Sequence, residues 1–356
     1  MKKFTAILFL FNIIIFSVVS YGQDNSTGDF NNTIKNLSSD AAKGYVGPVI
    51  GSFGSNLNSG WITKAPPATK FSFSLDLKII AMGSVIDDAQ KTFSTLGSFN
   101  FTESQAAEIA ANIPTDAGTQ AQIKQELLSH AWDLKISGPT IMGAEDQYVT
   151  LDFQGQTVQG YSIPNYQLTD VKGYISDLPL NLFPTATIQL GVGTFLGTNV
   201  AIRWFPKVNI KDLGDFTYWG FGLMHNPAIW FDQEFPVDIA VGYFYQDLKV
   251  GTIFETKTNL FGIFASKTYG SIISLTPYAG ITTESAKTTI QYDYTYDEDT
   301  GTGPVTRTQN ISFEMEAPNS VGFTIGAAFK LAILNLNIDY KFANVNTVSA
   351  GLTFGF

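Results

Sequence analysis

The sequence predicts an all-β protein, a transmembrane antiparallel β-barrel of about 12 to 14 strands. Only 15% of the 356 residues are charged and 44% are hydrophobic, whereas a soluble domain carries about 25% charged residues. Beyond residue 20, polar or small residues interrupt each apolar run long before the ~20 apolar residues that a membrane-spanning helix needs. Apolar and polar residues instead alternate over segments of about ten residues, the length of a tilted strand that crosses a bilayer.

The polar face of these segments distinguishes a barrel from a secreted β-sandwich. In the segment 70–80, Phe71 and Phe73 share one face of a strand, and Ser72 and Ser74 share the other. The polar faces carry mostly Gly, Ser, Thr and Asn, whereas the wet face of a sandwich usually carries longer charged side chains. Small uncharged residues suit a crowded lumen, and aromatic residues near strand ends suit the girdles at membrane interfaces. Both observations favour the barrel.

The first 22 residues have the layout of a signal peptide. Lys2 and Lys3 precede an apolar stretch over residues 4–19, and small residues precede a cleavage point after Gly22. The alternative, an uncleaved N-terminal anchor, is less favoured because the stretch is shorter than a full membrane span. We therefore expect export and residence in the cell outer membrane. The chain has no Cys, which excludes disulfides and thiolate metal sites.

Twelve segments after the signal peptide have the alternation of strands. They lie near residues 70–80, 148–154, 157–163, 185–193, 198–205, 215–225, 237–247, 258–267, 272–297, 308–330, 334–342 and 346–356. The segments 272–297 and 308–330 are long enough to be one or two strands each, which gives the range of 12 to 14. An even number places both ends of the barrel on the periplasmic side. The acidic loop around Asp297 then lies outside the cell.

Residues 23–69 are predicted to be an N-terminal hatch, or plug, inside the barrel. The stretch is rich in Gly, Ser, Asn and Pro, so alone it would be a flexible tether. Asn and Ser supply the hydrogen bonds that irregular backbone needs when it is shielded inside a barrel. The plug is favoured over the tether because Tyr45, Val49, Phe53 and Trp61 are apolar anchors that a tether does not use.

Residues 81–147, within the barrel region 70–356, are predicted to form a helical insertion after the first strand. The segment around Ala107 has a helix-forming composition, and Ile123, Leu127 and Trp132 recur at helical spacing. The parity of the strands places this insertion outside the cell. It caps the barrel mouth, dips into it, or is a folded outer loop that binds nothing.

The layout of the chain resembles that of a known class of membrane barrels. A Gly-rich segment ending in NLNSGWITKAPPAT, a first strand, an early helical insertion and the later stretch GFGLMHNPAIWFDQEFPVDIAVGYFYQ together resemble the uncharacterised outer-membrane barrels of Bacteroidota. Those are similar in layout to the FadL-like transporters of long-chain fatty acids and other hydrophobic compounds. The resemblance implies 14 strands, a hatch that fills the lumen, and a hydrophobic ligand that leaves sideways or through the hatch. This chain differs in the position of its insertion and lacks an Asn-Pro-Ala run in its hatch.

Charged residues on inward-facing positions are candidates for ligand binding or for clamping the hatch, because buried charge needs a partner or water. Asp76 and Lys78, and likewise Asp339 and Lys341, are two residues apart on one strand face and are expected to form local ion pairs. Arg203 has no such neighbour. It either holds the hatch, which is the favoured reading, or receives a ligand carboxylate in two-pronged geometry. Together with Trp61 and Phe53 of the hatch, Arg203, Lys78 and Lys341 are the candidate site residues.

The chain has few residues of the types that catalysis or cofactor binding requires. His130 and His225 are the only histidines, and they stand in unrelated contexts, so we expect no catalytic triad, no metal site, no cofactor and no enzymatic activity. The acidic residues Asp297, Glu298 and Asp299 are interpreted as a solvated loop rather than a cation site. A net charge of −10 with two arginines excludes nucleic acid as a partner, since such binding depends on clustered cations.

Two functions from different classes remain open at this stage. The first is an outer-membrane barrel that binds or passes a hydrophobic, fatty-acid-like small molecule. The alternative is a non-conducting structural or secretion-partner barrel that docks another protein through its outer loops. The expected partners are the outer-membrane bilayer and the assembly machinery, which in barrels of this kind recognises a terminal aromatic residue such as Phe356.

Overall fold

The structure, a computed structural model, describes residues 37–356 apart from 177, 211–213, 233–234, 300–302 and 356. The predicted signal peptide, the first part of the predicted hatch (23–36) and the terminal Phe356 lie outside the described residues. No helix within the described ranges combines the length and the hydropathy required to cross a membrane.

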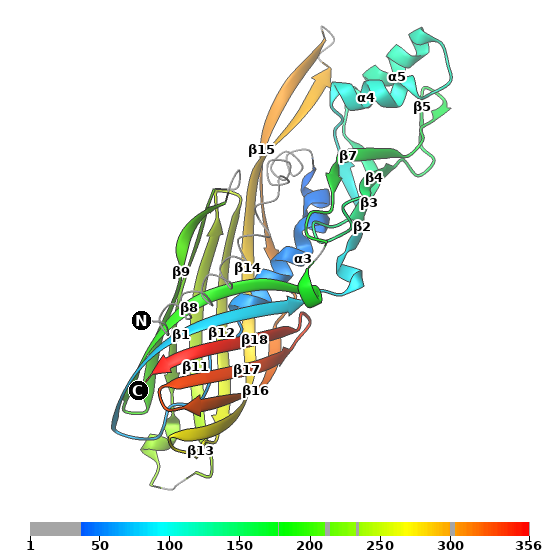
Figure 1. Cartoon of the computed structure of the whole chain (residues 1–356). Helices are drawn as coiled ribbons and strands as arrows, with labels where there is room; N and C mark the ends of the chain where they lie inside the picture. Colours follow the sequence, from blue (N-terminus) through cyan, green and yellow to red (C-terminus); the bar gives the residue numbers. More distant parts are fainter. Residues whose placement is uncertain (1–36, 177, 211–213, 233–234, 300–302, 356) are drawn as a thin grey trace, which may run out of the picture.

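Ten antiparallel strands form a closed ring, in which β12 pairs with β14 and β1 pairs with β18 (Figure 1). In chain order they are β1 (Phe71–Val85), β8 (Leu182–Phe195), β9 (Thr198–Ile210), β10 (Gly214–His225), β11 (Asp238–Val250), β12 (Phe254–Ser266), β14 (Ile273–Asp299), β16 (Val321–Leu331), β17 (Leu334–Phe342) and β18 (Thr347–Gly355). Ring closure rules out the sandwich, because a sandwich keeps two separate sheets. The protein is therefore a β-barrel.

The barrel has two unlike ends. β1 begins and β18 finishes at one end, where Asp76 pairs with Gly355 and the short β8–β9 turn at Leu196 and Gly197 also lies. We call this the termini end. The opposite end carries the chain between β1 and β8 and is called the insertion end. Both barrel ends of the chain thus lie on one side, as an even number of strands requires. The largest connection, between β1 and β8, lies on the other side.

A long hairpin extends the barrel at the insertion end. Strand β14 spans 27 residues, and its second half pairs with β15 (Pro304–Glu316), while its first half pairs with β16. β15 and β16 thus lie end to end along β14, so each of the two long predicted segments is a single pass. A short strand, β13 (Tyr269–Gly270), pairs with the start of β14.

The ring contains ten strands, not the 12 to 14 expected from the sequence, and not the 14 implied by the resemblance. The two surplus segments, 148–154 and 157–163, form β4 (Tyr148–Asp152), β5 (Thr157–Val158) and β6 (Tyr161–Ser162) in other sheets. Alternation reports that a strand is half buried, but it does not say which sheet the strand joins. Five residues are also too few to cross a bilayer.

The insertion spans residues 86–181 and is a mixed α/β subdomain, so the expected all-helical range 81–147 is too short. Its sheet has the order β2 (Thr92–Phe99), β3 (Trp132–Pro139), β4 and β7 (Tyr166–Lys172), and its helices are α4 (Glu103–Ala111) and α5 (Ala117–Ser129). Two short 3₁₀ turns, Asp88–Gln90 and Pro179–Asn181, flank it, and a third, Pro227–Trp230, follows β10. Trp132 lies in β3 rather than in a helix, because α5 ends three residues earlier and the indole donates to the Leu127 carbonyl at 3.2 Å.

Side chains of the barrel strands alternate between an exposed outer face and a buried lumen. In β17, Leu336 and Ile338 are 52% and 59% exposed, whereas Asn337, Asp339 and Lys341 are buried. The outer face is apolar and the lumen face is polar, which is the reverse of a water-soluble barrel.

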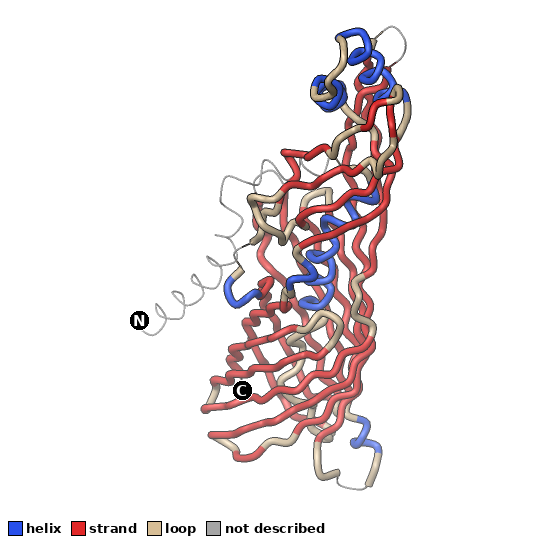
Figure 2. The backbone as a smooth tube through the Cα atoms, turned by 90° about the vertical axis from the view of Figure 1, so that its right-hand side faces the viewer, coloured by secondary structure: helices blue, strands red, loops and turns tan. Residues whose placement is uncertain are grey.

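Helix α3 (Ser39–Leu57) occupies the upper lumen and contacts β1, β8, β12 and β14 around the ring. Figure 2 shows this helix running down between the long hairpin and the insertion toward the barrel wall. Its buried residues belong to one apolar core that continues through the insertion and into β14. Helix α3 therefore connects the barrel wall to the insertion and to the long hairpin.

Candidate functional site

The C-terminal end of α3 points into the lumen, where its backbone carbonyls need partners. The last carbonyls of a helix have no helical donor and carry partial negative charge. Lys341 donates from Nζ to the Ser55 carbonyl at 3.0 Å, and Lys78 donates from Nζ to the Gly60 carbonyl at 2.9 Å. No carboxylate oxygen of Asp76 lies within ion-pair distance of Lys78 in the described chain. The expected Asp76–Lys78 pair is thus replaced by a contact to the hatch.

Arg203 is fully buried and contacts the same segment. Its Nη1 donates to the Ser59 carbonyl at 2.9 Å, and its Nε donates to Gln189 Oε1 at 2.8 Å. The guanidinium Cζ lies 3.6 Å from the centre of the Trp61 ring, a cation–π geometry. Gln246, within reach of Arg203, donates to the Leu57 carbonyl. Arg203 therefore contacts Ser59 and Trp61, two residues of the predicted hatch.

Lys341 forms a buried ion pair with a residue of β14, one strand beyond its neighbour β16, rather than along its own strand. Its Nζ lies 2.8 Å from Glu284 Oε2, and both side chains are almost fully buried. Asp339, the expected partner, accepts a hydrogen bond from the Tyr278 hydroxyl at 2.8 Å. Residues two apart on one strand face are separated by about 6.6 Å along the strand, and long side chains from a nearby strand reached over β16 are the partners found here. The expected Asp339–Lys341 pair is wrong for that reason.

Ser and Asn side chains complete the attachment of α3. Ser55 Oγ donates to the Val345 carbonyl at 2.7 Å and accepts from Asn319 Nδ2 at 3.0 Å. Asn56 Nδ2 donates to the Phe183 carbonyl at 2.9 Å. Buried polar groups in native proteins are paired in this way. Their partners come from three separate stretches of the chain, so the end of the helix is fixed from several sides.

Close packing, in addition to hydrogen bonding, fixes the position of α3. A Cβ atom on Gly54 would lie 2.5 Å from the Cβ of Ala317 and 2.8 Å from that of Ala286, so only glycine fits. Phe53 packs edge-on against Phe183, with ring centres 5.2 Å apart.

Trp61 fills the lumen below α3. Its ring centre is 4.7 Å from that of Phe244, in a small apolar cluster that includes Phe264 and Tyr278. Sequence reasoning did not single out Phe244, Gln246 or Glu284. Their alternate positions along β11 and β14 indicate that they face inward. The alternation does not indicate which side chains they contact.

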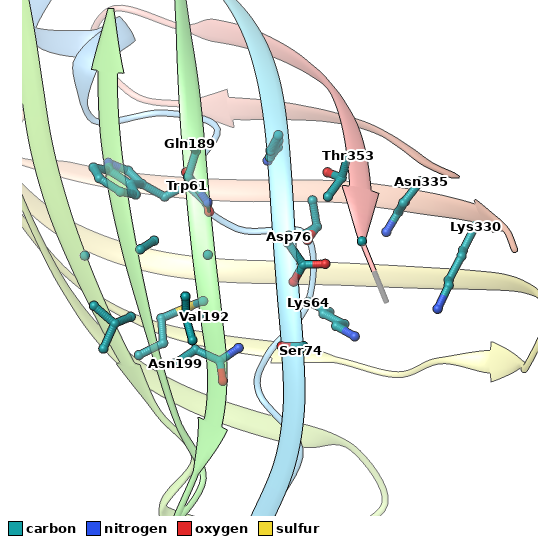
Figure 3. Close-up of a pocket in the computed structure, with 18 of the residues that line it drawn as sticks. Trp61, Lys64, Ser74, Asp76, Gln189, Val192, Asn199, Lys330, Asn335 and Thr353 are labelled. Carbon is teal, nitrogen blue, oxygen red and sulfur yellow. Dashed lines mark hydrogen bonds between the residues drawn. The ribbon is translucent and has the colours of Figure 1, made fainter. Parts of the chain in front are cut away.

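Two cavities lie on opposite sides of the barrel wall near the termini end. The first is a lumen cavity of about 110 Å³ beside Trp61 (Figure 3). The second is an outer groove of about 530 Å³, lined by aromatic side chains that include Phe71, Phe195 and Trp230. Val192 of β8 and Val200 of β9 line both cavities.

The two histidines lie in different parts of the structure. His225 Nδ1 is 3.0 Å from Thr198 Oγ1, and His225 Nε2 accepts from the Trp230 indole at 3.0 Å. His130 lies in the insertion, with Nδ1 2.8 Å from Ser129 Oγ. Within the part of the chain that the structure describes, no group of three or more His, Asp or Glu side chains has the arrangement of a metal site.

The long hairpin and α3 are both attached to the insertion. Asp297 Oδ2 accepts from the backbone N–H of Glu103 at the start of α4, at 2.9 Å, and Oδ1 accepts from Thr306. A carboxylate at a helix N-terminus is stabilising, so this acidic residue ties the hairpin to α4. The Tyr45 hydroxyl donates to the Lys172 carbonyl at 2.8 Å. Burial raises the pKa of Tyr45 well above its ordinary value, so this hydroxyl remains a donor.

Solved structures with a similar arrangement are bacterial outer-membrane barrels. The transport unit of the autotransporter AIDA-I from Escherichia coli is 9% identical, the match covers 86% of this chain and 97% of that one, and the TM-score is 0.23. OmpT of Vibrio cholerae is 10% identical, with 83% and 100% covered and a TM-score of 0.23. The N-terminal barrel domain of Pseudomonas aeruginosa OprF is 13% identical, with 45% and 94% covered and a TM-score of 0.18. The barrel assignment above rests on the strand pairing itself.

A comparison with curated protein sequences found no match to this chain. The model of the family of unknown function DUF6588 matches residues 1–356. The chain therefore belongs to the DUF6588 family.

Proposed function

We propose that the protein is an outer-membrane barrel that binds or passes a hydrophobic small molecule, with α3 and residues 58–69 closing the lumen at rest. One observation carries the proposal. The lumen cavity and the outer groove meet at the same two side chains, Val192 and Val200. A hydrophobic molecule in the outer groove is then separated from the lumen by the β8–β9 wall alone. This role involves no covalent catalysis.

Residence in a membrane is supported by the outer face of the barrel. Large apolar side chains are exposed on strands all around the ring. They include Phe73, Val200, Ile202, Phe221, Leu223, Phe261, Ile263, Ile281, Phe323, Ile325, Phe329, Leu336 and Ile338. Monomeric soluble proteins rarely expose apolar patches larger than a few hundred Å², whereas lipid makes such a face favourable. The predicted export signal is consistent with the outer membrane of a Gram-negative cell.

The wall between the two cavities is irregular. The β8–β9 register shifts between Val192 and Phe195, and the β1–β8 register shifts between Phe71 and Ser74. Shifts of this kind interrupt the ladder of hydrogen bonds and bend the strands. An interrupted ladder lowers the number of hydrogen bonds that must break for a molecule to enter sideways at this part of the wall.

The test is to block this part of the wall and measure the bound molecule. Protein extracted from native membranes in mild detergent is analysed by mass spectrometry for co-purified hydrophobic compounds. Val192→Trp and Val200→Trp are each expected to reduce the recovered compound by about fivefold or more, because each adds a large side chain at a position that lines the outer groove and the lumen cavity. Val321→Trp, on the exposed outer face of β16, is the matched control and should leave recovery unchanged. Equal recovery from all three variants would reject the sideways route.

A second candidate function, docking of another protein, is favoured by the insertion end. One continuous apolar core joins α3, the insertion and β14, and the two cavities described above are lined by other residues. A rigid body of this kind suits a docking platform. Shortening the hairpin between residues 294 and 309 tests it. Docking predicts loss of a specific co-purified protein, whereas transport through the β8–β9 wall predicts that no protein is lost and that recovery of the hydrophobic compound is unchanged.

A further inference from the structure

We propose that the lumen cavity at the termini end is a binding site for a phosphate-class oxyanion, either free phosphate or the headgroup of a phospholipid. The cavity lies beside Trp61 and the beginning of β1 (Figure 3). The proposal stands on the polar lining of this cavity and does not depend on the hydrophobic ligand proposed above.

Charge is the first observation. Lys64, Lys78 and Lys330 line the cavity, and Asp76 is the only carboxylate among the described lining residues. Figure 3 shows Lys64, Asp76 and Lys330 around the same space. Three lysines against one carboxylate leave a formal surplus of two positive charges in a confined space with partly apolar walls. Such a space concentrates anions.

The lysine ammonium groups are not used up by other contacts. No carboxylate oxygen in the described chain lies within 4.0 Å of the Nζ of Lys64 or Lys330. Lys78 has one acceptor there, the Gly60 carbonyl, and an ammonium has three N–H donors. Lysine binds phosphate as a compact point charge. Arg203 differs in that its Nη1 and Nε donate to Ser59 and Gln189 and its guanidinium stacks on the Trp61 ring, which leaves Nη2 without a partner.

Unpartnered polar atoms on the cavity wall are the second, independent observation. Trp61 Nε1, Thr353 Oγ1 and Asn335 Oδ1 are buried and have no hydrogen-bond partner in the structure, and all three residues line the cavity. Buried polar groups without partners are rare in native proteins. The indole N–H and the hydroxyl each offer a donor, and a phosphate oxygen is an acceptor that satisfies both. Asn335 Oδ1 is itself an acceptor, so the amide of Asn335 can serve an anion only through its Nδ2 donors.

The size of the charge favours phosphate over carboxylate. A phosphate monoester carries about −1.5 to −2 near neutral pH, which matches the two surplus positive charges, whereas a carboxylate carries a single negative charge. A carboxylate would also use fewer of the donors. The lining therefore suits a multivalent anion with three or more acceptor oxygens.

The test is a titration of the purified full-length barrel in detergent with inorganic phosphate, followed by calorimetry. We expect saturable one-to-one binding. The double variant Lys64→Gln/Lys330→Gln should weaken it by about tenfold or more, because two of the attracting charges are lost. Lys135→Gln, an exposed lysine in β3 of the insertion, is the matched control and should bind within about twofold of the unaltered protein. Asp76→Asn should tighten binding by about threefold, since it removes the repelling carboxylate.

Heat-dependent migration on gels confirms that each variant is folded, so that lost binding is not lost structure. Tighter binding of acetate than of phosphate, no saturable phosphate binding, or equal weakening in Lys135→Gln would each overturn the proposal. Competition separates the two sources. Displacement of inorganic phosphate by phosphatidic acid in nanodiscs, but not by phosphatidylcholine, identifies a lipid headgroup, and absence of displacement identifies the free ion. The wall variants Val192→Trp and Val200→Trp test the hydrophobic ligand separately.

Discussion

The lumen contains two polar regions, one around the end of α3 and one at the termini end, and they differ in how their cations are held. Around the end of α3, Lys341, Arg203 and Lys78 each donate to a hatch carbonyl. At the termini end, buried atoms of the cavity wall have no partner. In the sequence the two regions look alike, because in both of them polar residues occupy the inward-facing, alternate positions of the strands. Around α3 the buried cations are held by carbonyls of the chain, whereas Lys64 and Lys330 at the cavity have no carboxylate within ion-pair distance in the described chain. Unpartnered buried atoms such as Asn56 Oδ1 and Arg203 Nη2 occur around α3 as well, so the position of the cations is what separates the two regions.

The largest expected effect comes from breaking the buried pair in the region around the end of α3. Lys341→Ala leaves Glu284 buried without its cation, and such an uncompensated charge costs about 3–5 kcal/mol. The free energy of unfolding in urea, measured in lipid vesicles, checks this. Lys287 and Glu314 form an exposed ion pair on the outside, so Lys287→Ala is the control and should cost less than about 1 kcal/mol. Equal losses in both variants would show that the buried pair does not hold the hatch.

Arg203→Ala tests whether the contacts between the barrel cations and the hatch keep the lumen closed. The variant loses charge-assisted hydrogen bonds to the hatch and to Gln189, each worth about 1.5–3 kcal/mol. We expect a less stable barrel that leaks ions in planar bilayers while hydrophobic uptake is unchanged. Reduced uptake without leakage would instead assign Arg203 to ligand binding.

Gly54→Ala tests the close approach between the hatch and the wall. The added methyl group would overlap Ala317 and Ala286, and overpacking costs about 1–3 kcal/mol. Gly47 lies in the same helix, where a Cβ would be 3.8 Å from the Met315 methyl group. Gly47→Ala should therefore stabilise the helix by about 0.5–1 kcal/mol. The two substitutions are expected to shift the urea midpoint in opposite directions, and a common direction would contradict the packing argument.

The smallest expected change in the free energy of unfolding is in the cavity wall, and it is compared with a substitution at the end of α3. Thr353→Val removes a hydroxyl that has no partner and should change the unfolding free energy by less than about 0.5 kcal/mol. Ser55→Ala removes a hydroxyl bonded to Val345 and Asn319 and should cost about 1–3 kcal/mol. Similar costs at both positions would mean that the cavity hydroxyl is held by contacts other than a bound anion.

Much of the barrel follows from local pattern. The strand face predicted to point inward is the buried face in β17, where Asn337 and Asp339 are buried and Leu336 is exposed. The long segments 272–297 and 308–330 are single passes, as the parity argument assumes. Ten of the twelve predicted segments form the ring. The other two belong to the insertion, because alternation does not identify the sheet that a strand joins.

Trp132 shows how a local pattern fails. Its spacing from Ile123 and Leu127 suits a helix, but α5 ends at Ser129 and the chain continues as β3. Helix propensity is a weak prior, and pairing with β2 and β4 decides this segment. The ion pairs expected between neighbours on one strand fail for a related reason, since Glu284 reaches Lys341 from a different strand.

By itself the sequence determined the alternation, the polar lumen face, the apolar outer face and the inward positions of Lys78, Arg203 and Lys341. These are local properties, set by a side-chain period of two. Only the tertiary structure decided the number of strands in the ring, the partner of each buried charge and which lumen atoms stay unpaired. These depend on contacts between residues far apart in the chain, such as Lys341 with Ser55. Such contacts arise only when the ring closes around the helix, because closure sets which faces meet.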